Sequence, residues 1–443
     1  MEVSRRHILS TGAAAVAATC IPGRLLAAVE AATPPPPRLD DWAQVKKQFA
    51  LSPEWLHFAG FFIASHPQPV REAIEGFRRA IDENPFLAVH EGLFDDPAKN
   101  LHSRAVAEAA AYLGGKPEEV ALTRSTTEGL ALVYHGLPLG RGDEVLTTRH
   151  DHRAHHDAIR IASLRSGAST RKIALFDDSA TATAGSIVER LRAAVRPATR
   201  VIGITWVHSQ SGIRLPIRQI ASMVADLNRA RDSKDHLLLI VDGVHGLGCV
   251  DETVATMGAD YFCAGTHKWI FGPRGTGIVW ARPDRWARLR EVMPTFTDRE
   301  MFGAWTEDRA PGTPNNARRM TPGGFQAFEH QWALAAAFRF SQSLGRARVA
   351  ARVRELNQRI KKGLAALPRV KLHTPMDPEL SAGICCFDVE GRKPDEVVAA
   401  LLTRKVIAST SPYAVSCARL SAGICNTPDE VDRAVEAVRG ALA

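Results

Sequence analysis

The sequence predicts an α/β protein that has a large domain with a mostly parallel central sheet and a smaller C-terminal α+β domain. From about Glu118 onward, short apolar or β-branched runs alternate with amphipathic helical stretches. Strands separated by helices pair in parallel, because a parallel pair needs a long crossover connection. The run at 236–243 is apolar almost throughout, which is typical of a strand that is covered on both faces.

Length and composition agree with this class. The chain has 443 residues, of which 45% are hydrophobic and 23% are charged, enough for two or three domains with buried cores. Its formal net charge is +8, but the basic residues are spread singly and form no Lys/Arg block. We therefore expect no nucleic-acid partner, because phosphate backbones are bound by clustered positive charge. Anionic small substrates agree with this charge.

The cysteines give no sign of a metal or redox motif. There are seven, and none is part of a CxxC pair, which argues against a zinc ribbon or a redox dithiol. Cys385 and Cys386 are neighbours in a strand-like run, so we expect them to point to opposite faces as core residues. We expect the cysteines to be free thiols.

The first residues resemble an export signal. Arg5 and Arg6 precede a short alanine-rich apolar stretch, the pattern of a twin-arginine signal peptide, which we assign to 1–31. The stretch is too short for a membrane span, so we do not expect an integral membrane protein. An alanine-rich amphipathic first helix is the alternative. A Pro-rich linker at 32–39 follows, and we expect the folded body to begin near Leu39.

Three further regions are expected after the linker. Residues 40–115 form helices and loops that pack on the large domain or on a partner subunit, 116–325 form the large domain, and 326–443 form two long helices and the small domain. The strands of the large domain are expected at 118–124, 143–148, 171–177, 199–207, 236–243, 259–265 and 275–282. Its helices are expected at 125–137, 155–167 and 217–232. In the small domain we expect strands at 381–391, 406–410 and 417–426, and helices at 393–404 and from Thr427 onward.

Polar residues just past the strand ends are the candidates for a site, because ligands bind at the carboxyl edge of an open parallel sheet. The segment Ser125-Thr126-Thr127-Glu128 lies at a strand-to-helix step, where free amides and the helix dipole suit a phosphate. The hydroxyls of Thr126 and Thr127 are additional donors. The same S-x-x-E spacing is also an ordinary capping box. Ser209 follows another strand and either binds a ligand or completes a polar turn.

A cluster of histidines occupies a third strand end. His150, His152, His155 and His156 surround Asp151, and His152 with His156 has the i,i+4 spacing of a metal pair on a helix. No second cluster with metal-ligand spacing occurs elsewhere in the sequence, so we expect no metal. The alternative is that one of these histidines lies flat on an aromatic cofactor.

Asp242 and Lys268 indicate which cofactor that is. Asp242 ends a strand of apolar residues, and a carboxylate there is costly to desolvate unless it is paired. Lys268 follows after one loop and one further strand, so both side chains can reach one cleft. A pyridine nitrogen on Asp242, an aldehyde condensed with Lys268 as a Schiff base and a phosphate on the threonine turn are the three fixed points of pyridoxal phosphate. Lys268, once displaced by substrate, becomes the general base.

These segments resemble the class V aminotransferase family of fold-type I pyridoxal-phosphate enzymes, especially its isopenicillin N epimerase-like and cysteine desulfurase-like branches. The resemblance runs from about residue 50 to the end. STTEG resembles the phosphate turn, and DHRA resembles the segment that supplies the ring-stacking residue, here His152. VDGVHGLG resembles the ring site, with Asp242 on the pyridinium and His245 near the phenolic oxygen. THKWIFGPRGTG resembles the segment of the Schiff-base lysine, Lys268, and RLSAGICNTPDEVD places Arg419 as the clamp for a substrate carboxylate.

Three departures from the family pattern stand out. Gly265 occupies a position that is often serine in desulfurases, so we expect Thr266 or His267 to supply the missing phosphate contact. The glycine-threonine pair that often reaches the neighbouring subunit's phosphate is replaced by the segment 321–324. Desulfurases carry a cysteine on a mobile loop well before the substrate arginine, but here only Cys417 is near it. The last point argues against a persulfide-forming desulfurase.

The resemblance implies a homodimeric enzyme with pyridoxal 5'-phosphate as cofactor and Lys268, His152 and Asp242 as catalytic residues. We expect it to act at the α-carbon of an amino-acid-like substrate with a carboxylate, by epimerase or racemase chemistry of the isopenicillin N type. A class V aminotransferase or a C–S (β-)lyase is the alternative. Two alternatives belong to other functional classes. They are a non-catalytic binding protein of this fold and a metal-dependent hydrolase that uses the histidines. The twin-arginine (Tat) machinery would export the folded enzyme, which is then periplasmic or secreted.

Replacing both Arg5 and Arg6 with Lys is expected to leave active, cofactor-loaded protein in the cytoplasm, because the export machinery recognises the paired arginines. Cell fractionation followed by an absorbance measurement of the bound cofactor checks this. Unchanged export of the double variant would show that the segment is not a twin-arginine signal.

Overall fold

The computed structural model describes residues 39–96 and 100–442. The expected signal peptide at 1–31, and all of the expected linker except Leu39, lie outside the described residues. Leu39 itself is buried in the main hydrophobic core. Within the described residues, no helix is both long and apolar enough to cross a membrane.

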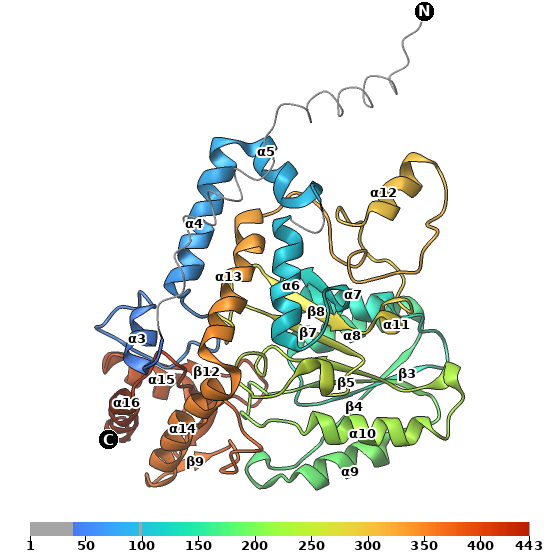
Figure 1. Ribbon diagram of the computed structural model, residues 1–443. Helices are drawn as coiled ribbons and strands as arrows, with labels where there is room; N and C mark the ends of the chain where they lie inside the picture. The colour runs from blue at the N-terminus through green and yellow to red at the C-terminus, as the bar shows by residue number, and fades with distance from the viewer. Residues whose placement is uncertain (1–38, 97–99, 443) are drawn as a thin grey trace, which may run out of the picture.

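The large domain is built on a seven-stranded sheet with the strand order β2-β8-β7-β6-β5-β3-β4 (Figure 1). β8 runs antiparallel to both of its neighbours, and the other pairs are parallel. The expected α/β fold with a mostly parallel sheet is confirmed. The strands are β2 (Val120–Thr123), β3 (Glu144–Thr148), β4 (Ser169–Ile173), β5 (Thr199–Thr205), β6 (Leu238–Asp242), β7 (Tyr261–Gly265) and β8 (Gly277–Ala281).

Helices cover both faces of this sheet, because successive strand residues point to opposite sides. Val145 packs into one core and Leu146 into the other. The first face is covered by α7 (Thr126–Gly136), α8 (Arg153–Ser166) and α11 (Pro283–Trp286). The second is covered by α6 (Leu101–Leu113), α9 (Ala184–Ala194), α10 (Ile217–Asn228) and α13 (Phe328–Leu344). Helix α9 has no counterpart among the expected elements.

The small domain is an antiparallel sheet with the order β12-β13-β10-β9, packed against three helices. The strands are β9 (Val370–Leu372), β10 (Cys385–Val389), β12 (Ser409–Thr410) and β13 (Ala418–Leu420), and the helices are α14 (Arg346–Ala365), α15 (Pro394–Thr403) and α16 (Pro428–Gly440). Cys385 lies in the core of this domain and Cys386 in the main core. They thus point to opposite faces, as expected, and the six described cysteines are free thiols.

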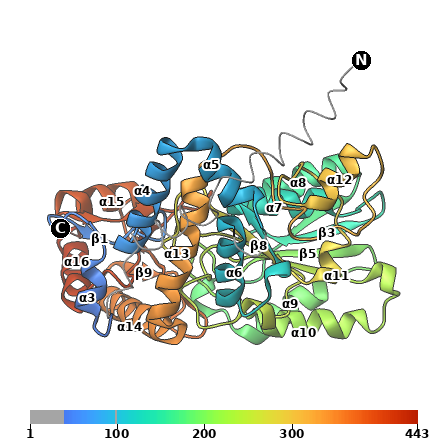
Figure 2. The same ribbon diagram turned by 45° about the horizontal axis from the view of Figure 1, so that its top comes forward.

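The N-terminal segment divides between the two domains, whereas the sequence led us to expect that 40–115 packs on the large domain or on a partner subunit. β1 (Leu56–His57) pairs in parallel with β11 (Val406–Ile407) of the small domain. Phe58 is fully buried in the core of that domain. Helix α3 (Trp42–Lys47) lies near α16 (Figure 2), and Lys46 forms an ion pair with Glu430. By contrast, α4 (Gln68–Glu83) packs on α13 of the large domain, as α6 does.

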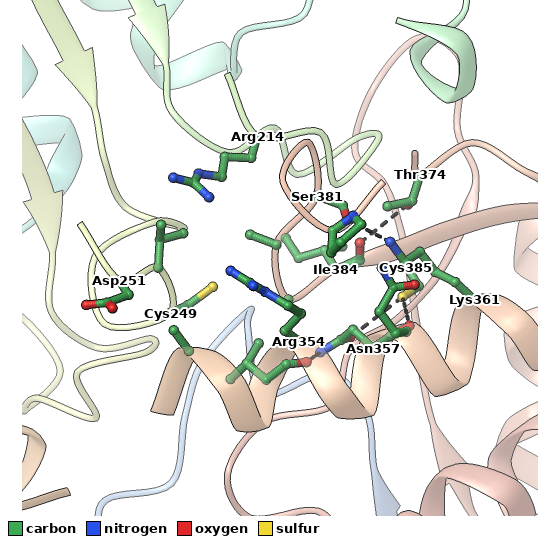
Figure 3. Close-up of a pocket in the computed structure, with 17 residues that line it drawn as sticks. Arg214, Cys249, Asp251, Arg354, Asn357, Lys361, Thr374, Ser381, Ile384 and Cys385 are labelled. Carbon is green, nitrogen blue, oxygen red and sulfur yellow. Dashed lines mark hydrogen bonds between the residues drawn. The ribbon is translucent and has the colours of Figure 1, made fainter. Parts of the chain in front are cut away.

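A buried lysine holds the segment between β9 and β10 against α14. Lys361 is 1% exposed, and its ammonium donates to the carbonyls of Pro375 (2.7 Å) and Met376 (3.2 Å) and to the hydroxyl of Ser381 (2.6 Å). Burial lowers the pKa of Lys361 to about 8. A cavity of about 30 Å³ lies beside these contacts (Figure 3). All three ammonium hydrogens of Lys361 therefore have acceptors in the chain.

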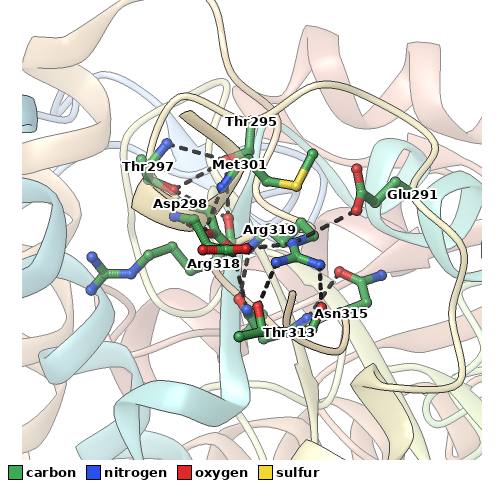
Figure 4. Close-up of polar contacts among 12 residues, drawn as sticks. Glu291, Thr295, Thr297, Asp298, Met301, Thr313, Asn315, Arg318 and Arg319 are labelled. Carbon is green, nitrogen blue, oxygen red and sulfur yellow. Dashed lines mark hydrogen bonds and ion pairs between the residues drawn. The ribbon is translucent and has the colours of Figure 1, made fainter. Parts of the chain in front are cut away.

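An ion pair fixes the long segment that carries α12 (Arg299–Thr306). Asp298 caps this helix through the amides of Glu300 and Met301, and its other oxygen accepts from Arg319 at 3.2 Å. The Arg319 guanidinium also donates to the carbonyl (2.9 Å) and hydroxyl (2.8 Å) of Thr313 (Figure 4). Both charged side chains are buried, so the segment is anchored although it exposes large apolar side chains.

Candidate active site

The predicted site residues gather at the carboxyl edge of the large sheet. Lys268 follows β7, Asp242 ends β6, Ser209 follows β5 and His152 follows β3, while Thr126 begins α7 after β2. These strands are neighbours in the sheet except for β8, which lies between β2 and β7. Parallel strands bring their carboxyl ends to one edge, so residues far apart in the sequence come together there.

Lys268, His245 and Asp242 form the centre of this group. The amine of Lys268 lies 3.0 Å from Nε2 of His245, and Asp242 is only 3% exposed. Burial raises the pKa of Asp242 to about 6, although the amide of Val244 and the charge of Lys268 oppose the shift. Burial lowers the pKa of Lys268 to about 8. Both charged forms are thus destabilised, so the site favours a ligand that adds a positive charge at Asp242 and uses the neutral amine.

The threonine turn begins α7 and leaves backbone donors free at the start of this helix. Ser125 caps α7 by accepting from the amide of Glu128 at 3.1 Å, and the Glu128 carboxylate accepts from Arg124. Only the Ser125 half of the expected capping box is formed, because the Glu128 carboxylate bonds Arg124 and not the amide of Ser125. No hydrogen bond in the described part of the chain uses the amides of Thr126 and Thr127. The first turn of α7 keeps free donors at the positive end of the helix.

The surroundings of Gly265 account for the missing serine. A Cβ atom placed there would lie 2.8 Å from Cε1 of His267 and 3.1 Å from Oγ1 of Thr126. The amide of Gly265 itself donates to Oγ1 of Thr126 at 2.7 Å. The His267 ring therefore occupies the space next to the turn that a serine side chain would need.

Thr266 and Thr321 use their hydroxyls within the chain. Thr266 is fully buried, and its hydroxyl lies 3.1 Å from the carbonyl of Thr276 and 2.5 Å from its hydroxyl. Of the two expected replacements for the serine, only His267 keeps its side chain next to the turn. Thr321, in the segment that replaces the family's glycine-threonine pair, accepts from the amide of Leu122 and donates to the carbonyl of Ala317.

His152 is presented by a buried aspartate next to it. Asp151 is 2% exposed, and its carboxylate accepts from the hydroxyl of Thr147 (2.9 Å), from the amide and hydroxyl of Thr148 (both 2.8 Å) and from the amide of Thr205 (2.8 Å). These bonds tie the end of β3 to β5. They hold the turn from which His152 caps α8, with its ring exposed at the edge of the site.

The other histidines of the cluster are used structurally. His150 stacks on Phe176 with ring centroids 3.9 Å apart. His155 is buried and hydrogen-bonded to Tyr134 at 2.7 Å, and His156 bonds the carbonyl of Thr148. In the described ranges, no group of three or more His, Cys, Asp or Glu side chains is arranged to hold a metal ion.

Arg419 reaches the site from the small domain, where it lies on β13. It is 4% exposed, and its guanidinium donates to the carbonyls of Ser209 (2.9 Å) and Thr410 (2.6 Å). The guanidinium carbon lies 4.7 Å from the ring centre of Phe61, and the buried Nε atom has no partner among the described residues. An arginine held in this way keeps its charge and a free donor for a carboxylate.

Two residues on the same side of the site as Arg419 were not found from the sequence, Phe61 and Tyr413. Tyr413 donates to or accepts from Ser209 through its hydroxyl at 2.8 Å, and its ring meets His152 edge to face. Neither residue follows a strand of the central sheet, so a search of strand ends does not reach them. The aromatic pair in the segment Gly60-Phe61-Phe62 and the tyrosine before Arg419 can be interpreted as site residues only once the fold is known.

Comparison with known proteins identifies the family. The model of the family described as Aminotransferase class-V matches residues 64–434. The chain belongs to the aminotransferase class-V family. It is therefore an enzyme of the pyridoxal 5'-phosphate-dependent type, and the family predicted from its motifs is confirmed.

The class-V relatives differ in their reactions. The chain is 27% identical to isopenicillin N epimerase of Streptomyces clavuligerus, over 90% of this chain and 98% of that enzyme. It is 26% identical to probable cysteine desulfurase 2 of Mycobacterium leprae, over 80% of this chain and 85% of the relative. Among solved structures, a C-DES variant with glycine covalently linked to its PLP cofactor has a TM-score of 0.77 at 19% identity, covering 89% of this chain and 98% of that one.

The described residues of this class-V enzyme fit the cofactor. A buried carboxylate, a partly neutral amine and a helix N-terminus with free amides are the donor set that a pyridinium, an aldehyde and a phosphate require. Nδ1 of His245 is buried without a partner in the described chain, which leaves a polar atom available beside the amine. Asp242, Lys268 and the turn at Thr126 would hold the ring nitrogen, the aldehyde carbon and the phosphate respectively.

Replacing Asp151 with Asn is expected to lower the free energy of unfolding by about 2–3 kcal/mol. The side-chain amide of Asn would place its own N–H donors against some of the hydroxyl and amide donors that the Asp151 carboxylate accepts from. Burial alone would raise the pKa of Asp151, but His155, His208 and the bonds from Thr148 hold it at about 2, below its usual 3.8. The stabilisation is thus present above about pH 4 and is lost as the pH falls toward 2. Denaturant unfolding at pH 7 and pH 3 checks this: the wild type and variant should differ less at the lower pH, and an equal difference would contradict it.

Replacing Gly265 with Ser is expected to weaken the binding of pyridoxal 5'-phosphate about tenfold, because the new side chain displaces the His267 ring and a charge-assisted contact is lost. Titration of the apoenzyme with the cofactor measures the affinity. His267→Ala is the matched control, and adding Gly265→Ser to it should cost no further affinity. A single Gly265→Ser variant that binds as tightly as the wild type would show that His267 does not contact the phosphate.

Proposed function

We propose that this class-V enzyme is an amino-acid epimerase of the isopenicillin N type. The observation that carries the proposal is the pairing of Lys268 and Asp242 with the buried guanidinium of Arg419 in one site, without an accessible thiol beside them among the described residues. The relationship to isopenicillin N epimerase, over nearly the full length of both chains, supports it.

Each residue has a separate task in the proposed reaction. When bound, pyridoxal 5'-phosphate takes up the substrate amino group and draws electrons from the α-carbon, so that the α-proton becomes acidic. Arg419 binds the substrate carboxylate and fixes which face of the α-carbon is presented. Asp242 keeps a proton on the ring nitrogen through the negative charge of its buried carboxylate. Lys268 accepts the α-proton on its amine.

The depressed pKa of Lys268 suits this role. A lysine at its ordinary pKa of 10.5 is almost fully protonated at neutral pH, whereas with a pKa of about 8 roughly a tenth of the amine is neutral at pH 7. A base whose pKa lies near the working pH combines a usable neutral fraction with adequate strength. The hydrogen-bond distance to His245 also holds the amine at a defined position.

Cys417 argues against a desulfurase that forms a persulfide. It is the cysteine nearest in sequence to Arg419, and it is 4% exposed. Its thiol donates to the carbonyl of Gln210 at 3.1 Å, and it directly precedes β13, where the backbone is paired. A sulfur acceptor has to reach the substrate on a movable loop, so this thiol is badly placed.

A C–S (β-)lyase that needs no thiol is the second candidate, as is a class V aminotransferase. One solved relative of similar fold is described as a cystine C–S lyase, with a TM-score of 0.76 at 19% identity. Such an enzyme needs the same lysine, aspartate and arginine and differs only in which bond at the substrate breaks next. The reaction products therefore decide between the candidates.

We also propose that the enzyme is an exported homodimer. Phe302, Trp305 and Phe325 are 65%, 74% and 78% exposed, and all three lie in or next to the segment that carries α12. Large aromatic side chains are seldom exposed together on the surface of a monomer, so we expect a second copy of this chain to bury them. Export as a folded protein by the twin-arginine route would carry the cofactor along.

Incubation of the holoenzyme in deuterium oxide with isopenicillin N, L-alanine, L-cysteine and L-cystine tests the reaction type. An epimerase is expected to return α-deuterated substrate and its epimer, whereas keto acids would indicate a transaminase, and released sulfide or persulfide would indicate a lyase. Lys268→Ala is expected to lose the borohydride-sensitive visible band and all α-exchange. A wild type that produces keto acid or sulfide without the epimer would overturn the proposal.

A further inference from the structure

Epimerisation needs a second proton-transfer group, because the α-carbon loses its proton on one face and gains another on the opposite face. Lys268 serves one face only. The identity of the group that serves the other face rests on the proposed epimerase function. That group must lie across the cofactor site from Lys268, reach the substrate and carry a transferable proton.

The order of the strands shows which side lies across from Lys268. Along the carboxyl edge of the sheet, Lys268 follows β7, Asp242 ends β6, Ser209 follows β5 and His152 follows β3. Asp242, which would anchor the ring nitrogen, therefore stands between Lys268 on one side and Ser209 and His152 on the other. A second proton donor belongs on the side of Ser209 and His152.

Tyr413 occupies that side. Its hydroxyl lies 2.8 Å from the hydroxyl of Ser209, and its ring meets the ring of His152 edge to face, with centroids 6.2 Å apart. Tyr413 belongs to the loop between β12 and β13, and β13 carries Arg419. Arg419 in turn donates to the carbonyl of Ser209. The tyrosine and the expected carboxylate clamp are thus joined through one residue.

The other candidates on this side are less suitable. His152 has the expected task of covering the ring, and its Nδ1 already accepts from the amide of Ala154 at 3.2 Å. The thiol of Cys417 is turned to the carbonyl of Gln210. The hydroxyl of Ser209 is bonded to Tyr413, and a serine hydroxyl is a far weaker acid than a phenol.

We propose that Tyr413 is the proton-transfer group that faces Lys268 across the cofactor site. In one direction, the α C–H bond breaks and its proton moves to Nζ of Lys268, while the electron pair remains on the substrate and is held by the cofactor. The O–H bond of Tyr413 then breaks, a new C–H bond forms on the opposite face, and a phenolate is left. Water returns a proton to the phenolate and takes one from the Lys268 ammonium, so nothing is consumed. In the reverse direction water first takes the proton of the phenol and gives one to the amine of Lys268, after which the phenolate is the base and the Lys268 ammonium is the acid.

The environment of the phenol agrees with both halves of this cycle. Burial raises the pKa of Tyr413, so that the hydroxyl keeps its proton at neutral pH. The hydrogen bond with Ser209 and the charge of Arg419 act in the other direction and favour the phenolate. The phenol therefore holds its proton at rest, and Ser209 and Arg419 are the two neighbours that stabilise the phenolate once it forms.

Tyr413→Phe tests the proposal, because it removes the transferable proton and keeps the ring. Holoenzyme in deuterium oxide is given isopenicillin N, L-alanine and D-alanine, and each epimer is followed separately by NMR. Inversion is expected to fall by about 100-fold or more, which is the usual contribution of a general acid or base. The epimer whose α-proton faces Lys268 should still exchange it for deuterium, whereas the other epimer should not. Cofactor affinity, measured by titrating pyridoxal 5'-phosphate into the apoenzyme, should equal that of the wild type.

Tyr261→Phe is the matched control. Its hydroxyl donates to the carbonyl of Arg285 at 2.7 Å, away from the site residues, and this variant should invert and exchange like the wild type. Tyr413 would have only a structural role if Tyr413→Phe slowed the exchange of both epimers equally or weakened cofactor binding, and no role if inversion were unchanged. A wild type that exchanges α-protons without inverting any probe would overturn the proposed epimerase, and the role of Tyr413 with it.

Discussion

The burial of charge at the carboxyl edge of the sheet is the constraint on which the rest of the site depends. Asp242 ends a strand whose residues are all buried, and Lys268 reaches the same place from the next strand. Desolvation penalises both charged forms, so the site holds a raised carboxylate pKa and a lowered amine pKa at once. Neither the raised pKa of Asp242 nor the lowered pKa of Lys268 stabilises the fold by itself. Both are suited to a cofactor that brings a cationic ring nitrogen and reacts with a neutral amine.

The surrounding structure keeps this arrangement in place through polar contacts that do not belong to the reaction. Asp151 ties the end of β3 to β5 with four hydrogen bonds, and so fixes the turn that presents His152. Ser125 caps α7 and leaves the amides of Thr126 and Thr127 free. Arg419 is held by backbone carbonyls from both domains. The position of the small domain relative to the sheet therefore sets where the Arg419 guanidinium lies.

Much of the site was predictable from the sequence because each residue stands at a fixed offset from a strand end. An apolar run that ends on Asp242, with a lysine one strand later, places both side chains at the same edge of a parallel sheet. The histidine cluster was not predictable in the same way. His150, His155 and His156 differ in function from His152 only through their three-dimensional neighbours, such as Phe176 and Tyr134. The pairing of β1 with β11 was also unpredictable, because two-residue strands carry too little pattern to show their partner.

The sequence by itself determined the fold class, the family and the candidate residues of the cofactor site, because these follow from local periodicity and from motifs whose chemistry is fixed. Tertiary structure alone decided that His267 fills the space left by Gly265, that Thr266 turns to Thr276, and that Phe61 and Tyr413 complete the wall around Arg419. The physical reason is that such contacts join segments far apart in the chain. Side chains meet there because of how two domains pack, and no spacing along the sequence records that packing.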